Sequence, residues 1–147
     1  MRAYIASPFF NEAQIVRVER LKLILNQLKI DYFSPKDKSN LKFKGDSVSG
    51  LEVFRMNIAE IRQCDIVVCI TNDKDTGTLF EAGLAYGMNK SIFYLYDGGE
   101  SFNLMLSNSG VATTSFDELL GVLSTYLDGG ISYAEIRQSQ ADKYKTF

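Results

Sequence analysis

The chain's architecture is set by Asp65-Ile66-Val67-Val68-Cys69-Ile70 and by a second segment soon after it, Asp75-Thr76-Gly77-Thr78-Leu79-Phe80-Glu81-Ala82-Gly83-Leu84-Ala85. The first segment is typical of a buried parallel strand, and the second is typical of a polar loop that opens a helix of small residues. In open α/β sheets, ligands bind at the carboxyl ends of the strands. Asp75 and Glu81 stand at such an end, on either side of the flexible Gly77. The sequence therefore predicts two carboxylates at a ligand site.

Strand and helix patterns alternate on both sides of this stretch. Short apolar runs predict strands, and apolar residues repeated every three or four positions predict helices. We expect strands at 2–6, 30–33, 65–70, 91–96 and 111–114, and helices at 12–28, 50–63, from residue 78, at 102–106 and at 116–127. This alternation predicts an α/β, doubly wound, flavodoxin-like five-stranded parallel sheet with helices on both faces.

The chain length of 147 residues predicts a single domain over residues 1–147. The polar segment 36–49 is the longest predicted loop, and long loops in compact domains are usually functional or disordered. The tail at 129–147 is polar and aromatic. We expect it either to be disordered or to form a short helix on a neighbouring subunit.

Composition excludes several classes of protein. The net charge of −2 leaves no basic footprint, which argues against nucleic-acid binding through phosphates. No segment reaches the length of a membrane span, and Met1-Arg-Ala-Tyr-Ile-Ala6 is too short an apolar run for a signal peptide. We therefore expect a cytoplasmic protein with no membrane partner. Dinucleotide and nucleoside-triphosphate sites are not indicated, since neither a G-x-G-x-x-G fingerprint nor a Walker loop occurs.

The chain contains no histidine, and this limits the chemistry available to it. Ser-His-Asp and Cys-His sites cannot be built, and the imidazole ligands that usually hold zinc or iron are missing. Cys64 and Cys69 match neither a zinc pattern nor a redox C-x-x-C, so we expect them as small core residues in a reducing compartment. No metal and no organic cofactor are expected, and acid–base chemistry must rely on Asp, Glu, Tyr, Lys or Cys.

Glu81 has two interpretations. Thr78-Leu79-Phe80-Glu81 matches the T-x-x-E capping box, in which Thr78 caps the helix and Glu81 bonds back to its backbone N–H. Alternatively, Glu81 is a nucleophile. Both interpretations place the carboxylate in the first helical turn, where the helix dipole favours the ionised form that nucleophilic attack requires.

Three segments together resemble one family. They are Tyr4-Ile-Ala-Ser-Pro-Phe-Phe-Asn-Glu-Ala-Gln14, Asp75-Thr-Gly-Thr-Leu-Phe-Glu-Ala-Gly83 and Phe102-Asn-Leu-Met-Leu106. In this order they are similar to the nucleoside 2-deoxyribosyltransferases, over residues 4 to about 114. The resemblance implies transfer of 2-deoxyribose between nucleobases through a covalent deoxyribosyl–enzyme intermediate. It implies deoxynucleosides and free nucleobases as substrates, and a homo-oligomer with its sites at subunit interfaces.

The resemblance also implies roles for single residues. Glu81 matches the nucleophile that attacks C1′ of the sugar, Asp75 the carboxylate that orients the nucleoside, and Tyr4 a catalytic tyrosine beside the nucleophile. Asn103 matches an asparagine that reaches the sugar 5′-hydroxyl, in this family often from an adjacent subunit. The substrate is also expected to contact Gly77, Phe9 and Phe10. The two phenylalanine rings offer apolar surface on which a base can stack.

Each of these residues also has a purely structural interpretation. Tyr4 is alternatively a strand residue that packs in the core, and Asn103 is alternatively a helix N-cap. Phe9 and Phe10 are alternatively core residues.

The sequence departs from the family pattern in two places. Asn57 stands where many relatives carry an aspartate that is a candidate for protonating the leaving base. An amide can hydrogen-bond a base edge, but it cannot donate a proton in that sense. The segment 36–49 also lacks the glutamine that some relatives use to bind the base, and Asp37 or Asn40 is expected to substitute for it.

Three hypotheses for function follow. The first is a deoxyribosyltransferase with Glu81 as nucleophile. The second is a hydrolase of deoxynucleosides or their 5′-monophosphates, in which water takes the sugar. A 5′-phosphate calls for an anion cradle, and Ser7 and Ser101 are available but no Arg lies beside either. The third is a non-catalytic module that binds a nucleoside or nucleotide.

Overall fold

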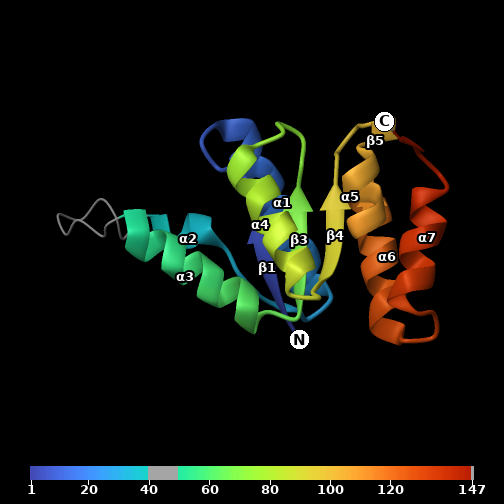
Figure 1. Ribbon diagram of the computed structural model, residues 1–147, viewed down its shortest axis with the longest axis horizontal. Helices are drawn as coiled ribbons and strands as arrows, with labels where there is room; N and C mark the ends of the chain where they lie inside the picture. The colour runs from blue at the N-terminus through green and yellow to red at the C-terminus, as the bar shows by residue number, and fades with distance from the viewer. Residues whose placement is uncertain (40–49, 147) are drawn as a thin grey trace.

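The computed structural model describes residues 1–39 and 50–146, and its centre is a parallel sheet with helices on both sides (Figure 1). The sheet has five strands in the order β2-β1-β3-β4-β6, all parallel, which is the flavodoxin-like order. The predicted fold class is therefore confirmed. The strands are β1 (Arg2–Ala6), β2 (Asp31–Phe33), β3 (Ile66–Ile70), β4 (Ser91–Leu95) and β6 (Val111–Thr113).

Two hydrophobic layers hold the helices to the sheet, because successive strand residues point to opposite faces. On β3, Ile66, Val68 and Ile70 join one apolar cluster, while Val67 and Cys69 join the other. The first cluster is covered by α1 (Glu12–Gln27) and α6 (Phe116–Asp128). The second is covered by α4 (Thr76–Gly87) and by the end of α3 (Gly50–Gln63). Cys64 and Cys69 are buried free thiols, as expected of core residues.

The C-terminal tail folds onto the chain's own sheet. Helix α7 (Tyr133–Ala141) buries Ile136, and the Tyr133 hydroxyl donates to the Ile92 carbonyl at 2.9 Å and accepts from the Ile92 N–H at 2.8 Å. Strand β7 (Lys145–Thr146) then pairs in parallel with β5 (Ser101–Phe102). These residues therefore form a helix and a strand that pack on their own chain, where disorder was one expectation, while a contact with another subunit stays a prediction.

Two further segments differ from the sequence prediction. The segment expected to be a loop from residue 36 begins as a short helix, α2 (Pro35–Ser39), while Asn40 and the rest of that segment lie outside the described residues. The helix expected at 102–106 is instead strand β5 followed by α5 (Leu104–Ser109). None of the helices in the described ranges is long and apolar enough to cross a lipid bilayer.

Candidate active site

A cavity of about 210 Å³ lies at the carboxyl ends of β1 and β3, where the strand order reverses direction. Ligands of doubly wound sheets bind at this kind of switch point. The cavity is walled by the segment after β1, the start of α4, and the facing sides of α2 and α3. Its lining comprises Ser7, Pro8, Phe9, Phe10, Pro35, Lys38, Val53, Met56, Asn57, Asp75, Gly77 and Glu81.

Tyr4 and Glu81 are brought together across the sheet and α4. The Tyr4 hydroxyl donates a hydrogen bond to Glu81 Oε2 in a buried setting. Burial and the neighbouring Glu81 charge raise the pKa of the Tyr4 phenol far above its ordinary value, so the hydroxyl stays protonated as a donor. Tyr4 also stacks on Phe33 with ring centroids 5.7 Å apart. Tyr4 therefore packs in the core and also contacts Glu81, while its catalytic role stays a prediction.

The pKa of Glu81 is raised from 4.5 to about 7, because burial, the largest cause, and the nearby Asp75 charge outweigh the Tyr4 hydrogen bond, which lowers it. The expectation that a first-turn position keeps Glu81 charged is wrong. Helix α4 begins at Thr76, so Glu81 lies beyond its first turn, where the helix dipole has little effect.

Asp75 is the N-cap of α4. Its Oδ2 accepts from the Thr78 N–H at 2.8 Å and from Thr78 Oγ1 at 2.9 Å. The predicted capping box with Thr78 as cap is therefore wrong, because Asp75 takes the cap position one turn earlier. Gly77 keeps room for this carboxylate, since a Cβ at residue 77 would stand 3.3 Å from Asp75 Oδ2.

Asn57, Phe9 and Phe10 line the same cavity. The Asn57 Oδ1 atom is buried and has no hydrogen-bond partner in the part of the chain that the structure describes. A buried acceptor without a partner is costly, and a ligand N–H can satisfy it. The Phe9 and Phe10 rings are 5.1 Å apart at their centroids, and Phe10 is 75% exposed. Phe10 is therefore not a core residue.

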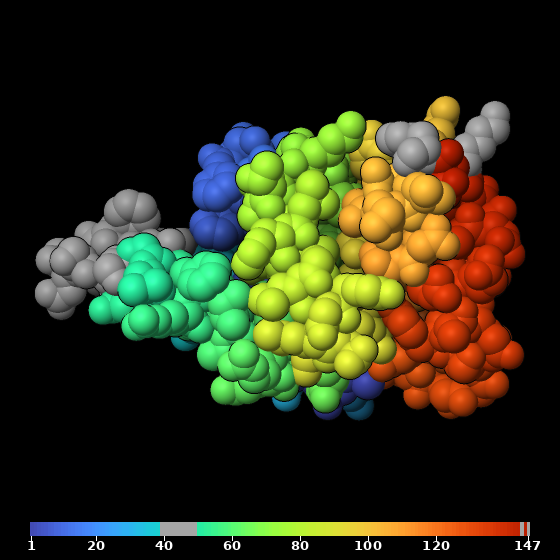
Figure 2. All heavy atoms as spheres, viewed as in Figure 1, coloured from blue at the N-terminus to red at the C-terminus, as the bar shows by residue number. Residues whose placement is uncertain are grey.

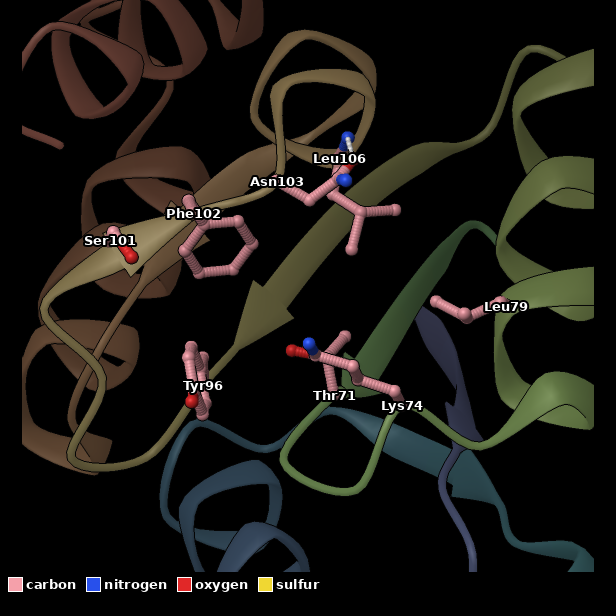
Figure 3. Close-up of a pocket in the computed structure, with 8 residues that line it drawn as sticks. All are labelled: Thr71, Lys74, Leu79, Tyr96, Ser101, Phe102, Asn103 and Leu106. Atoms are coloured by element: carbon pink, nitrogen blue, oxygen red, sulfur yellow. Dashed lines mark hydrogen bonds between the residues drawn. The ribbon is translucent and has the colours of Figure 1, made fainter. Parts of the chain in front are cut away.

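Two predicted residues lie away from this cavity. The Asp37 carboxylate accepts from Lys22 Nζ at 2.6 Å, which ties α2 to α1. Asn103 caps α5, accepting from the Met105 N–H at 2.9 Å and the Leu106 N–H at 3.2 Å. It lines a separate cavity of about 270 Å³ together with Lys74, Tyr96 and Ser101 (Figure 3). The N-cap interpretation of Asn103 is confirmed. Asp37 does not line the Glu81 cavity, so its role at a base stays a prediction.

Sequence reasoning singled out Asn57 but missed the other residues that α2 and α3 contribute to the cavity. Val53, Met56 and Asn57 are three and four positions apart, which puts them on one helix face, and all three line the cavity. This helical spacing is the sequence pattern from which Val53 and Met56 could have been predicted to share a face with Asn57. Lys38 also lines the cavity from α2, and no local pattern singled it out because the packing of α2 is a long-range property.

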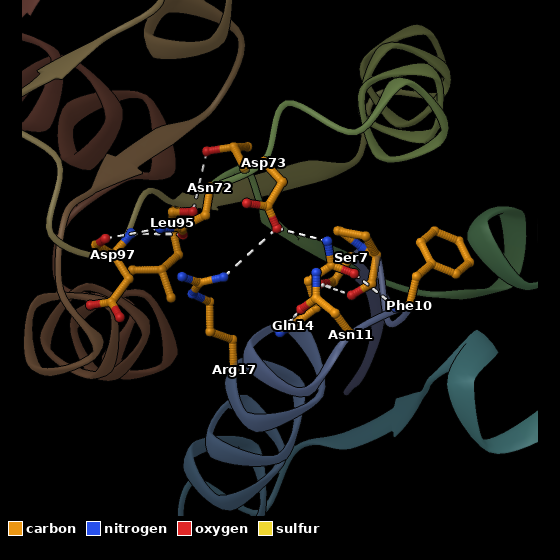
Figure 4. Close-up of polar contacts among 11 residues, drawn as sticks. Ser7, Phe10, Asn11, Gln14, Arg17, Asn72, Asp73, Leu95 and Asp97 are labelled. Atoms are coloured by element: carbon orange, nitrogen blue, oxygen red, sulfur yellow. Dashed lines mark hydrogen bonds and ion pairs between the residues drawn. The ribbon is translucent and has the colours of Figure 1, made fainter.

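A polar network holds together the loops that follow β1 and β3 (Figure 4). Gln14 Nε2 donates to Asp73 Oδ2 at 2.8 Å, and Gln14 Oε1 accepts from the Phe10 N–H at 2.8 Å. The loop after β1 is thereby tied to the loop after β3. Within the described ranges, no group of three or more His, Cys, Asp or Glu side chains is arranged to hold a metal ion. The chemistry that this site can perform comes from a buried carboxylate, a phenol donor and a second carboxylate.

Comparison with models of known families matches residues 3–118 to Nucleoside 2-deoxyribosyltransferase. Among solved structures, the 2-deoxyribosyltransferase of Bacillus psychrosaccharolyticus is 28% identical, with a TM-score of 0.69 over 82% of this chain and 90% of that one. A conserved protein from Enterococcus faecalis V583 has a TM-score of 0.69 at 16% identity, and the match covers 95% of this chain and 98% of that one. A CMP N-glycosidase from Clostridium botulinum has a TM-score of 0.63 at 19% identity, and the match covers 86% of this chain and 100% of that one. These two share the fold. No curated protein sequence matches this one.

Proposed function

The chain belongs to the nucleoside 2-deoxyribosyltransferase family, and from this premise we propose that it exchanges nucleobases on 2′-deoxynucleosides through a covalent deoxyribosyl-Glu81 intermediate. The observation that carries the proposal is the pairing of Glu81 with Tyr4 and Asp75 in the cavity at the strand-order reversal. A buried carboxylate that ionises near neutral pH can serve as a nucleophile, and it remains reactive because few water molecules solvate it.

The proposed reaction has two displacements at C1′. In the first, ionised Glu81 forms a bond to C1′ as the C1′–N bond breaks, and the bonding electron pair leaves with the base. Positive charge that develops on the sugar is stabilised by the Glu81 and Asp75 carboxylates, as in retaining glycosidases. In the second, a nitrogen of another base attacks C1′ and the Glu81 carboxylate departs. Tyr4 orients Glu81 by donating to Oε2, which leaves Oε1 for the attack.

The test is an exchange assay with deoxyinosine, performed with and without adenine. We expect deoxyadenosine to form only when adenine is present. Glu81→Gln keeps an acceptor for the Tyr4 hydroxyl and removes the nucleophile, so it should lose exchange by about 10³-fold or more. Hypoxanthine released at one rate whether or not adenine is present would instead indicate hydrolysis, the class of activity named for the Clostridium botulinum structure. Full activity of Glu81→Gln would contradict the mechanism.

The proposed active form is a homo-oligomer in which Asn103 of one copy completes the Glu81 cavity of another. Two observations support this. Asn103 does not line the Glu81 cavity of its own chain. A groove of about 280 Å³ also lies between α4 and α5, on the face drawn in Figure 2, and both helices carry exposed apolar side chains. These side chains are Phe80, Tyr86, Leu104 and Met105.

Mixing two inactive variants tests this arrangement. Glu81→Gln and Asn103→Ala are each expected to be inactive alone. If Asn103 acts across an interface, subunit exchange rebuilds intact sites, about a quarter of the total for a randomly mixed dimer. Light scattering on the unmodified protein should show an oligomer. A fully active monomer, or a mixture with no recovered activity despite proven exchange, would contradict the proposal.

A further inference from the structure

The Glu81 cavity has an unequal distribution of charge. Asp75 and Glu81 stand on the side formed by the β3–α4 loop and α4, and Lys38 is the only cationic residue among those that line the cavity within the described part of the chain. Cleavage of a glycosidic bond also separates charge, because positive charge develops on the sugar and negative charge on the departing base. Sites that stabilise developing charge place opposite charges where it appears.

Lys38 is available to act on a ligand. Within the described residues it makes no hydrogen bond and no ion pair. The neighbouring acid does not neutralise it, since the Asp37 carboxylate pairs with Lys22. Lys36, two residues before Lys38, pairs with Glu19 at 3.1 Å. Among the described residues, Lys38 is therefore the basic side chain of α2 that lines the cavity and has no ion-pair partner.

Stereochemistry places the base on the side of C1′ away from Glu81. Glu81 must approach C1′ from the face opposite the leaving base, so the base lies across the cavity from Glu81. Helices α2 and α3 supply other parts of the lining, where Val53 and Met56 offer apolar surface for a ring. The unpartnered Asn57 Oδ1 in the same cavity can accept from a base N–H. A base packed on Val53 and Met56 would have Asn57 and Lys38 as polar partners among the residues that line the same cavity.

We propose that Lys38 is a catalytic residue that stabilises the leaving base, in place of the carboxylic acid that Asn57 cannot supply. This inference rests on the proposed function. As the Glu81–C1′ bond forms and the C1′–N bond breaks, the electron pair stays on the base and is delocalised onto its carbonyl oxygen. The Lys38 ammonium donates a hydrogen bond to that oxygen. The base departs as an anion and takes its proton from water on leaving the cavity.

The proposed role of Lys38 predicts that the effect of its removal on the cleavage rate depends on how readily the base departs. Lys38→Met keeps the length and removes the charge, and Lys38→Arg keeps the charge. We compare single-turnover cleavage of deoxyuridine with that of 5-fluorodeoxyuridine, whose fluorine makes the departing base a weaker base. If the unmodified enzyme accepts only purines, deoxyinosine and its 8-aza analogue form the pair. Lys38→Met should slow the poorer leaving group by about 10²-fold and the better one by at most about tenfold.

Matched controls separate this role from a structural one. Lys36→Met removes a neighbouring lysine that pairs with Glu19, and it should leave both rates within about twofold. Lys38→Arg should recover most of the lost rate for the poorer leaving group. Equal slowing of both substrates by Lys38→Met, or no slowing, would overturn the proposal. If the unmodified enzyme cleaves neither substrate of either pair, the proposed function itself fails. That result differs from one in which the unmodified enzyme is active and only the Lys38 proposal fails.

Discussion

The Glu81 carboxylate is the residue on which the proposed chemistry depends, and its protonation is set by three neighbours that act in different directions. Burial and the Asp75 charge raise its pKa, and the Tyr4 hydroxyl lowers it. With a pKa of about 7, Glu81 is ionised in a substantial fraction of molecules at neutral pH. Because nucleophilic attack needs the ionised form, kcat/KM should rise with pH through about 7.

Tyr4→Phe should move this rise in activity to higher pH. The substitution removes the hydrogen bond that lowers the Glu81 pKa, so a smaller fraction of Glu81 is ionised at pH 7. We expect kcat/KM at neutral pH to fall several-fold, with much of the loss recovered in alkaline solution. The measurement is the pH dependence of kcat/KM, with Tyr32→Phe as the matched control on the neighbouring strand. A rate lowered equally at every pH would contradict the prediction.

Glu81→Gln should stabilise the fold more in alkaline than in acidic solution. The folded-state pKa of about 7 lies above 4.5, so the folded protein binds the proton more tightly than the unfolded chain does. The stability that comes from the protonated carboxyl is full below pH 4.5 and is lost as the pH rises through about 7. Gln imitates the protonated form at every pH.

Urea unfolding at pH 5 and at pH 8 measures this effect. The gain in free energy of unfolding should be about 2–3 kcal/mol larger at the higher pH. Glu12→Gln, at an exposed carboxylate on α1, is the control and should show a much smaller difference. Equal gains at both pH values would mean that Glu81 is not held in a desolvated site.

Among the elements, α4 decides the geometry of the site because its starting residue determines where Glu81 stands. Thr78 and Asp75 are both residue types that cap helices. The folded chain uses Asp75, which adds a half-turn or more before Glu81 and moves that residue away from the helix end. Asp75 thus has two structural effects, since it starts the helix and raises the Glu81 pKa by its charge.

Asp75→Asn separates these two effects. Asn caps a helix about as well as Asp does, so the free energy of unfolding should change little, while Asp75→Ala should cost about 1 kcal/mol. Loss of the charge removes one cause of the raised Glu81 pKa, so the rise of kcat/KM should move to lower pH whatever the residual rate. A rise that stays in place would show that the Asp75 charge does not act on Glu81.

In the molecule as a whole, the C-terminal helix completes one hydrophobic layer. Ile136 on α7 is 6% exposed and packs in the cluster that also contains Phe93 and Phe116. A domain of this size has a limited core, so each large buried side chain contributes a noticeable part of the stability. The matched family model ends at residue 118, and the fold continues past it to β7.

Ile136→Ala should lower the free energy of unfolding by about 2–4 kcal/mol, because it removes buried apolar atoms and leaves a cavity. Ile131→Ala is the matched control, since Ile131 is 48% exposed, and should cost about 0.5 kcal/mol or less. Denaturant unfolding followed by circular dichroism measures both. Similar small losses for the two variants would mean that α7 does not contribute to the core in solution.

Sequence periodicity was sufficient for the sheet and its helices, because the alternation of apolar residues records which face of each element is buried. It also placed Asp75 and Glu81 in the segment that follows the carboxyl end of β3, since that position follows from chain order in a parallel sheet. Motif resemblance then identified the family. These inferences depend on residues close together in the chain, or on the rules of parallel-sheet topology.

Only the tertiary structure decided which side chains surround Glu81 and what they do to its charge. The raised pKa comes from burial and from contacts between β1 and α4, which are 77 residues apart at Tyr4 and Glu81. The choice of Asp75 as cap, the placement of Lys38 and Asn57 in the cavity, and that of Asn103 outside it likewise depend on packing. Local patterns record backbone hydrogen bonding and amphipathic faces, whereas electrostatics and ligand shape arise from groups brought together by the fold.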